Sequence, residues 1–192
     1  NQIKLLNSTN AFLKIASGVS LTEDKVKEMG FPTSNQNTVI PKNYVLFNGT
    51  STYTGKQKQN FIDGSYEKSD FGLIPMAGVN KFNVKNLNRG SLKKATINFT
   101  VHSKEQFTIV DVLYLRLGYT VFLEWGNSAY TTNGKDYEIQ SNSLIETDFF
   151  SNDINYRTLQ TKISNQRNET GGNYDGLVGK ISNFDWTFKP DG

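Results

Sequence analysis

The sequence predicts one mainly β domain of the α+β class, an antiparallel β-sandwich or partly closed barrel with a flanking α-helix and one or two short helices. Three observations predict this class. Several short segments alternate apolar and polar residues, as half-buried strands do, and one segment between them has helical spacing. The polar residues are mostly Asn, Gln, Ser and Thr, which suit exposed strands and turns.

The 192 residues, 36% of them hydrophobic, are enough for one domain with a buried core. Within residues 1–192 we expect an N-terminal arm over about residues 1–40 and a polar excursion over about residues 54–70. Because the chain begins at Asn1 rather than Met, we expect it to be processed or to be a fragment of a longer protein.

The first local signal is a short helix between Ser20 and Gly30. Ser20 and Glu23 have capping-box spacing, and Pro32 follows the predicted end. Farther along, Asn48-Gly49 follows an apolar run and predicts a hairpin turn. The polar segment from Thr54 to Ser69 predicts a surface loop.

The strongest strand signal is a pair of alternating segments joined by Asn88-Arg89-Gly90. The apolar residues of these segments are Phe82, Val84, Ala95, Ile97, Phe99 and Val101. Asn and Gly tolerate positive φ, so an antiparallel hairpin is the expected connection. A helix of about four turns is predicted next, from the capping-box pair Ser103 and Gln106 to Leu117 before Gly118.

After Gly118 the apolar period returns to two, and both faces of the segment Tyr119–Trp125 are largely apolar. This pattern predicts a central strand. A turn is expected over Asn127–Gly134. The weaker strand material after it is Tyr137, Ile139, Leu144 and Ile145.

The last third of the chain predicts a second helix and a closing strand. Asp153 is the expected N-cap of a helix whose shared face is Tyr156, Leu159 and Ile163, and Gly171-Gly172 ends it. The closing strand is Val178–Phe188, with a bulge near Ser182-Asn183 because the apolar parity changes there.

Composition excludes several kinds of chemistry. The chain has no cysteine, so disulfides, thiolate metal sites and Cys nucleophiles are excluded, and one histidine argues against a zinc site. The 21 basic and 18 acidic residues nearly balance, and no long Lys/Arg run occurs, so specific nucleic-acid binding is not expected. No apolar stretch is long enough for a membrane span.

Glu124 is the most tempting catalytic candidate, because it lies in a strand rich in Leu, Phe and Trp. Burial raises a carboxyl pKa, as a glycosidase acid requires, but no second carboxylate can be assigned to face it. The competing hypothesis is an ion pair with Arg116 or a nearby lysine, which we favour because buried charges are rarely unpaired. His102, the single histidine, is expected to be structural.

Other polar and aromatic residues also have ordinary structural explanations. Asp148, Asp153 and Asp175 lie in Asn/Gly-rich segments but without calcium-loop spacing, so turn chemistry explains them. Six aromatic residues are expected in the core, although they are also able to stack on sugars or bases: Tyr119, Phe122, Trp125, Phe184, Trp186 and Phe188. We therefore predict no catalytic, cofactor-binding or metal-binding residue, and no enzyme.

Six segments over roughly the central and final thirds of the chain form a shared pattern: 72–79 (GLIPMAGV), 90–97 (GSLKKATI), 113–119 (LYLRLGY), 122–126 (FLEWG), 172–176 (GNYDG) and 179–184 (GKISNF). In these segments the chain resembles a family of large-phage virion proteins, the tail-tube-like baseplate or hub proteins. One departure is Ala77, where the family pattern prefers proline. The resemblance implies a tail-tube type of fold that assembles into rings, and a further turn and strand after Gly192.

The expected function is that of a structural subunit of a phage-type tail or baseplate, located in the virion and assembled in the host cytoplasm. Its expected partners are copies of itself and other tail or baseplate proteins around a channel. Two alternatives stay open at this point. One is a carbohydrate-binding β-sandwich, which exposed tryptophan would favour, and the other is a cell-wall-cleaving enzyme that uses Glu124.

Overall fold

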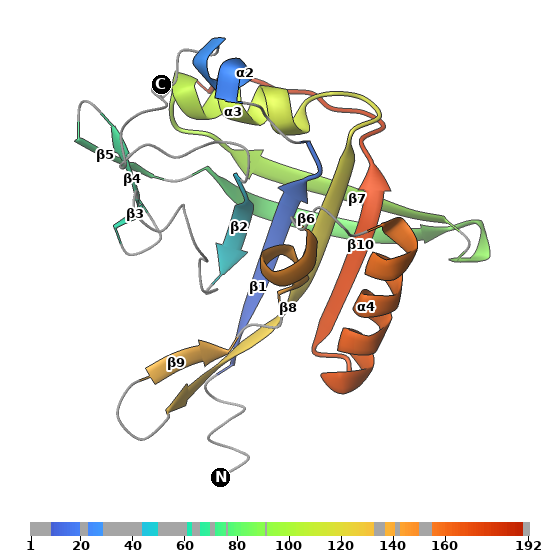
Figure 1. Cartoon of the computed structure of the whole chain (residues 1–192). Coiled ribbons are helices and arrows are strands. Elements are labelled where there is room, and N and C mark those ends of the chain that lie inside the picture. The colour runs from blue at the N-terminus through green and yellow to red at the C-terminus, as the bar shows by residue number, and fades with distance from the viewer. Residues whose placement is uncertain are drawn as a thin grey trace.

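The chain folds as a mainly β protein in which one large sheet curls into an open half-barrel (Figure 1). The computed structural model describes residues 9–19, 23–28, 44–49, 61–62, 66–69, 72–75, 77–90, 92–132, 137–140, 143–149 and 155–189. The strands of the large sheet are β1 (Thr9–Ser17), β2 (Leu46–Gly49), β6 (Gly78–Leu87), β7 (Leu92–Thr100), β8 (Thr120–Thr132), β9 (Tyr137–Gln140) and β10 (Tyr174–Lys180).

Within the described residues, the remaining elements are a small sheet, three helices and two single turns. The small sheet contains β3 (Phe61–Ile62), β4 (Tyr66–Ser69) and β5 (Gly72–Pro75). The helices are α2 (Glu23–Glu28), α3 (Lys104–Tyr114) and α4 (Tyr156–Glu169). The turns are a 3-10 turn at Asn88–Gly90 and a π-helical turn at Ile145–Phe149.

The large sheet has the strand order β10-β8-β1-β2-β6-β7, and β9 pairs with the far end of β8. All pairs are antiparallel except β2 with β6, which are parallel at Phe47 and Gly78. Strands β7 and β10 therefore end the sheet on its two sides. Among the described residues, neither β7 nor β10 has a strand partner on its outer side.

Strand β1 lies in the middle of the sheet, within the segment that the sequence assigned to an N-terminal arm. Both of its faces are buried: Leu13 and Ile15 on one, Phe12 and Ala16 on the other. A strand that is buried on both sides lacks the simple alternation of a half-buried strand. That is why periodicity did not reveal it.

The sheet separates two hydrophobic clusters. The cluster on the α3 side contains Leu13, Ile15, Tyr44, Leu46, Ala77, Val79, Ile109, Val110, Leu113, Tyr114, Leu115 and Leu123. The cluster on the α4 side contains Phe12, Ala16, Val45, Phe122, Leu144, Ile145, Leu159, Ile163 and Tyr174. The predicted parity of β8 is confirmed, because Leu123 and Phe122 face opposite clusters.

Helix α3 begins as the sequence predicts and ends earlier. Ser103 is its N-cap and accepts the Gln106 backbone N–H at 3.1 Å, while the Gln106 side chain accepts the His102 N–H at 2.7 Å. The predicted end at Leu117 is wrong, because the helix stops at Tyr114. Gly118, with φ of 82°, then donates its N–H to the Ile181 carbonyl at 2.8 Å, which draws the chain away from the helix.

The β6-β7 hairpin is confirmed, with Asn88 and Arg89 at φ of 48° and 56° in its turn. Two other predicted turns are wrong. Asn48 and Gly49 lie within β2, opposite Leu13 and Phe12 of β1. The expected turn over Asn127–Gly134 is strand up to Thr132, because β8 continues past the body of the sheet to pair with β9.

The polar excursion is also more ordered than its composition suggests. Strands β3 and β4 lie inside the segment Thr54–Ser69 that the sequence assigned to a loop, and β4 pairs with β5. The backbone hydrogen bonds between these strands form although the sequence is polar and has little hydrophobic alternation. Residues 54–60 lie outside the described residues, as do Ser20 and Pro32 of the first predicted helix.

Four predictions in the last third need correction. Leu144 and Ile145 belong to a helical turn rather than a strand. The N-cap of α4 is Asn155, which accepts the Thr158 N–H at 2.9 Å, whereas Asp153 lies outside the described residues. Leu159 and Ile163 are buried as predicted, but Tyr156 faces solvent.

The closing strand is the largest of these differences. Strand β10 covers Tyr174–Lys180, so the expected closing strand is confirmed only over Val178–Lys180. Residues 181–189 form no strand, and the predicted continuation to Phe188 with its bulge is wrong. The ladder between β10 and β8 ends at Lys180 and Thr120. Beyond that point Ile181 donates its N–H to the Tyr119 carbonyl at 3.0 Å and accepts the Gly118 N–H at 2.8 Å, without extending the strand.

Candidate functional site

The buried carboxylate of Glu124 is the centre of the first candidate site. Glu124 lies in the middle of β8, directly opposite Lys14 of β1 and Gly176 of β10. Both ionisable side chains are buried, with Glu124 0% and Lys14 2% exposed. They share the sheet face that carries Phe122 and Tyr174, so the pair lies in the layer under α4.

Hydrogen-bond donors from two other elements surround the Glu124 carboxylate. The hydroxyl of Ser143 donates to Oε1, and the backbone N–H of Leu144 donates to Oε2 at 2.8 Å. The N–H of Ile145 and the hydroxyl of Tyr174 donate to Oε2 at 3.3 and 2.9 Å. Buried polar groups need such partners, so the carboxylate ties the start of the helical turn 145–149 to the sheet.

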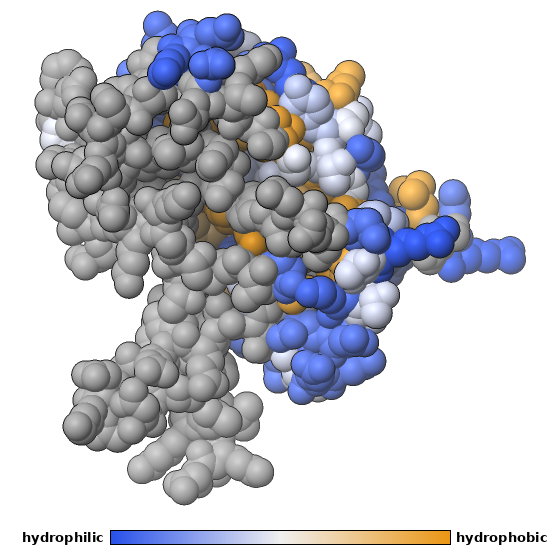
Figure 2. Space-filling model, viewed as in Figure 1, coloured by the Kyte–Doolittle hydropathy of each residue, from blue (hydrophilic) through white to orange (hydrophobic). Residues whose placement is uncertain are grey.

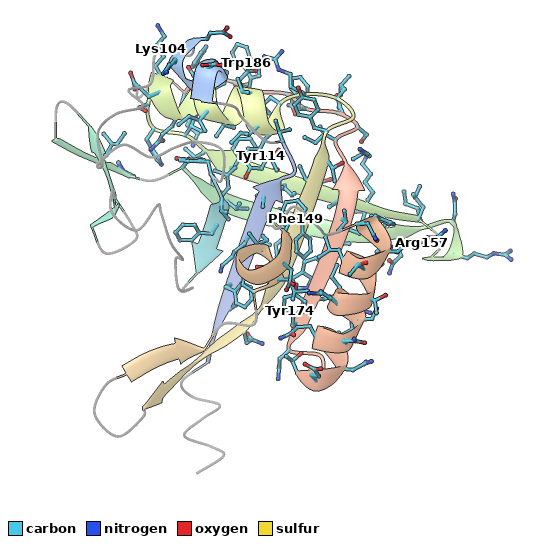
Figure 3. The ribbon with its side chains drawn as sticks, viewed as in Figure 1. Lys104, Tyr114, Phe149, Arg157, Tyr174 and Trp186 are labelled. Atoms are coloured by element: carbon cyan, nitrogen blue, oxygen red, sulfur yellow. The ribbon has the colours of Figure 1, made fainter. Side chains whose placement is uncertain are left out.

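Burial raises the pKa of the Glu124 carboxyl, and the hydrogen bonds from Ser143, Leu144 and Tyr174 and the Lys14 charge oppose that rise. Burial also raises the pKa of the Tyr174 phenol, and the adjacent Glu124 carboxylate adds to this effect. Figure 3 shows Tyr174 and Phe149 on the α4 side of the sheet, in the region of this network. The network is therefore a buried, polar connection between β1, β8, β10 and the 143–145 segment.

This geometry identifies the partners that the sequence left open. Arg116 does not pair with Glu124; its guanidinium contacts Asp111 at 2.6 Å on the far side of the sheet, on α3. The lysine that faces Glu124 is Lys14, which sequence reasoning missed because the β1 strand itself was missed. Since a catalytic acid has to contact its substrate, a Glu124 that is 0% exposed is placed for structure rather than for glycoside cleavage in this conformation.

The other polar candidates also have structural partners. Asp148 forms an ion pair with Lys162 of α4, and Asp175 forms one with Arg167. His102 uses its backbone N–H to complete the capping arrangement of α3. Within the described parts of the chain, no group of three or more His, Cys, Asp or Glu residues is arranged to hold a metal ion.

The segment after β10 places three aromatic residues on the surface instead of in the core. We call Phe184, Trp186 and Phe188 the aromatic tail; they are 38%, 53% and 78% exposed. The rings of Trp186 and Phe188 lie 5.1 Å apart, and Trp186 packs against Phe107 of α3 with centroids 5.5 Å apart (Figure 3). The expectation that these residues are core is wrong, and Tyr119 is also exposed, whereas Phe122 is buried as predicted.

An open groove of about 230 Å³ lies where β8 passes the start of β10. Its walls include Trp125 and Phe82, whose rings are 5.7 Å apart, and the side chains of Asn127 and Asn173. Aromatic faces beside amide groups are able to bind sugars by stacking and hydrogen bonding. The groove is therefore the second candidate site.

Comparison with protein-family models, with curated proteins and with solved structures finds no match for this chain. Among the described residues, no helix has both the length and the apolar character needed to cross a membrane.

Proposed function

We propose that this chain is a structural subunit of a phage-type tail or baseplate, of the hub or tube-like kind, which assembles through contacts with copies of itself and with other tail proteins around a channel. The observation that carries the proposal is the open half-barrel. Its two end strands, β7 and β10, have outer sides without strand partners among the described residues. Such edges pair readily with another chain unless they are protected.

The chemistry of the interior supports a scaffold. The polar groups of the Glu124 network satisfy one another inside the protein, and Tyr114 of α3 donates to the Ile15 carbonyl of β1 at 3.0 Å. These buried bonds fix the relative positions of strands and helices. The resemblance to tail-tube-like baseplate proteins gives this scaffold its proposed place in the virion, after assembly in the host cytoplasm.

The aromatic tail provides the surface on which this proposal is tested. Exposed Trp and Phe side chains are typical of the buried centres of protein interfaces. We expect the double variant Trp186→Ser/Phe188→Ser to self-associate less than the unmodified protein in sedimentation velocity runs over a concentration series. Tyr156→Ser, which removes an aromatic side chain that is 54% exposed on α4, is the matched control.

The control should leave self-association unchanged, and circular dichroism should show that all three proteins are folded. A chain that stays monomeric at every concentration, or a double variant that associates as strongly as the control, would contradict the proposal.

A carbohydrate-binding module is the second candidate, and the Trp125 groove is the observation that favours it. If the groove binds sugars, cell-wall oligosaccharides will change the fluorescence of Trp125, and Trp125→Ala will lose binding while Trp186→Ala keeps it. Absence of binding to a panel of such oligosaccharides would remove this candidate.

A further inference from the structure

The β6-β7 hairpin forms a ribbon with an unusual distribution of charge. Residues 71–104 contain six Lys and Arg residues and no Asp or Glu, although basic and acidic residues nearly balance over the whole chain at 21 and 18. Five of the six lie on the ribbon, and all five are exposed: Lys81, Lys85, Arg89, Lys93 and Lys94. None of them forms an ion pair with any residue in the described part of the chain.

Strand register sorts the ribbon into two faces. The inner face carries the pairs Phe82–Ile97, Val84–Ala95 and Asn86–Lys93. Of these residues, Val84, Ala95 and Ile97 pack against the α3 cluster. The outer face carries the pairs Lys81–Asn98, Asn83–Thr96, Lys85–Lys94 and Leu87–Leu92. The outer face therefore combines cations with amide and hydroxyl groups and ends in two exposed leucines.

Two features of the outer face are unfavourable for the isolated protein. Lys85 and Lys94 lie directly opposite each other, and like charges at opposed positions destabilise a strand pair. Arg89 has a left-handed backbone at φ of 56°, a conformation that glycine adopts at lower cost. Binding of a polyanion would offset both unfavourable features, because the polyanion neutralises the two opposed lysines and contacts the cation that Arg89 places at the tip.

The ribbon also projects from the body, where a large partner can reach it. Figure 1 shows β6 and β7 extending beyond the other strands, and Figure 2 shows the projecting end as mainly hydrophilic with a hydrophobic patch. Leu92 is 54% exposed there. A two-stranded ribbon is narrow enough to enter the major groove of DNA, and leucine is among the side chains that proteins insert between base steps.

We propose that the outer face of the β6-β7 ribbon binds the phosphate backbone of duplex nucleic acid without preference for base sequence. Lys81, Lys85 and Lys94 contact phosphates along the face, Arg89 contacts them at the tip, and the interleaved polar groups donate hydrogen bonds. Lysine is depleted in protein–protein interfaces, whereas Lys, Asn and Thr are common phosphate contacts. The composition of the face therefore favours nucleic acid over an acidic protein.

The test is the salt dependence of binding to a fluorescent DNA duplex of about 20 base pairs with arbitrary sequence. Each phosphate contact contributes about −0.9 to the slope of log K against log salt, so up to four contacts give a slope of at most about −3.6. The double variant Lys85→Gln/Lys94→Gln should reduce the magnitude of this slope by about 1.8. The corresponding loss of affinity is about 200-fold at about 50 mM salt and about 20-fold at about 200 mM.

The matched control is Lys104→Gln/Arg157→Gln, which removes the same charge from exposed residues of α3 and α4. This control should keep the unmodified slope, and thermal melting should show that both double variants are folded. The proposal is overturned if the unmodified protein shows no salt-dependent binding, or if the two double variants lose affinity equally. It is also overturned if a polyglutamate peptide of equal charge competes as well as unlabelled duplex, which would indicate an acidic protein as the partner.

Discussion

Removal of the buried carboxylate in Glu124→Ala is predicted to destabilise the fold severely. The substitution takes away the acceptor of four hydrogen bonds, two of which come from the backbone N–H groups of Leu144 and Ile145. A buried N–H without an acceptor costs about 1–3 kcal/mol. The substitution also removes the negative charge that faces the buried Lys14 across the strand pair, and a buried charge that loses its compensation costs several kcal/mol.

These costs share one small site and do not add. A water molecule that enters the space left by the carboxyl group satisfies part of the lost bonding. We therefore expect the free energy of unfolding to fall by about 4 kcal/mol, a large part of the roughly 5–15 kcal/mol that stabilises an ordinary domain. Glu124→Gln keeps the shape and one of the two acceptor oxygens but also removes the charge that faces Lys14, so it should lose about 2–3 kcal/mol, less than Glu124→Ala.

The assay is urea unfolding followed by tryptophan fluorescence, at a protein concentration where association does not change between variants. The control is Glu169→Ala, at an exposed position of α4, and its free energy of unfolding should stay within about 0.5 kcal/mol of that of the unmodified protein. A loss of less than about 1 kcal/mol for Glu124→Ala would refute the reasoning, because it would mean that the network contributes little to the fold. A loss in Glu124→Gln as large as in Glu124→Ala would show that charge, and not hydrogen bonding, dominates.

Three further outcomes follow from particular contacts. Because burial raises the pKa of Glu124, the contribution of this residue to stability is complete below its unfolded pKa of 4.5 and declines as pH rises through the folded pKa. The unfolding free energy of the unmodified protein minus that of Glu124→Gln should therefore fall above pH 4.5. A difference that stays flat or rises with pH would contradict this prediction. Gly126→Ala places a Cβ 2.5 Å from a backbone oxygen and should lower the free energy of unfolding by about 1–3 kcal/mol in the same assay. Gly179→Ala places its Cβ in open space and should leave that free energy nearly unchanged. Equal losses in the two variants would show that the close approach at Gly126 does not limit the side chain. Tyr114→Phe removes a buried hydroxyl that donates to the Ile15 carbonyl, so the free energy of unfolding should fall by about 1–2 kcal/mol. An unchanged midpoint of unfolding would argue that this hydrogen bond does not connect α3 to β1.

Much of the central fold was predictable from local sequence patterns. The β6-β7 hairpin alternates cleanly, the α3 N-cap carries both members of its capping box, and β8 has apolar residues on both faces. In each case the signal is contained within a few neighbouring residues. Long-range pairing produces the rest: β1 and β2 become strands because they pair with each other and with β8 and β6.

The candidate sites also combine features that local sequence patterns reveal with features that only long-range contacts produce. Glu124 was visible as an acid among apolar residues, but its partners come from three other segments that local patterns do not connect. The basic ribbon was hidden for a related reason, because its cations are spaced along two strands and the acidic residues lie elsewhere in the chain. The aromatic tail alternates like a strand, yet no strand within the described residues pairs with it, so pattern alone placed it wrongly in the core.

Direct imaging of the purified protein at high concentration tests the proposed assembly most directly. Class averages of negatively stained particles should show closed rings with a central opening, in which the open half-barrels of neighbouring copies lie side by side. Particles that remain single compact domains at all concentrations, with and without candidate tail partners, would contradict the account.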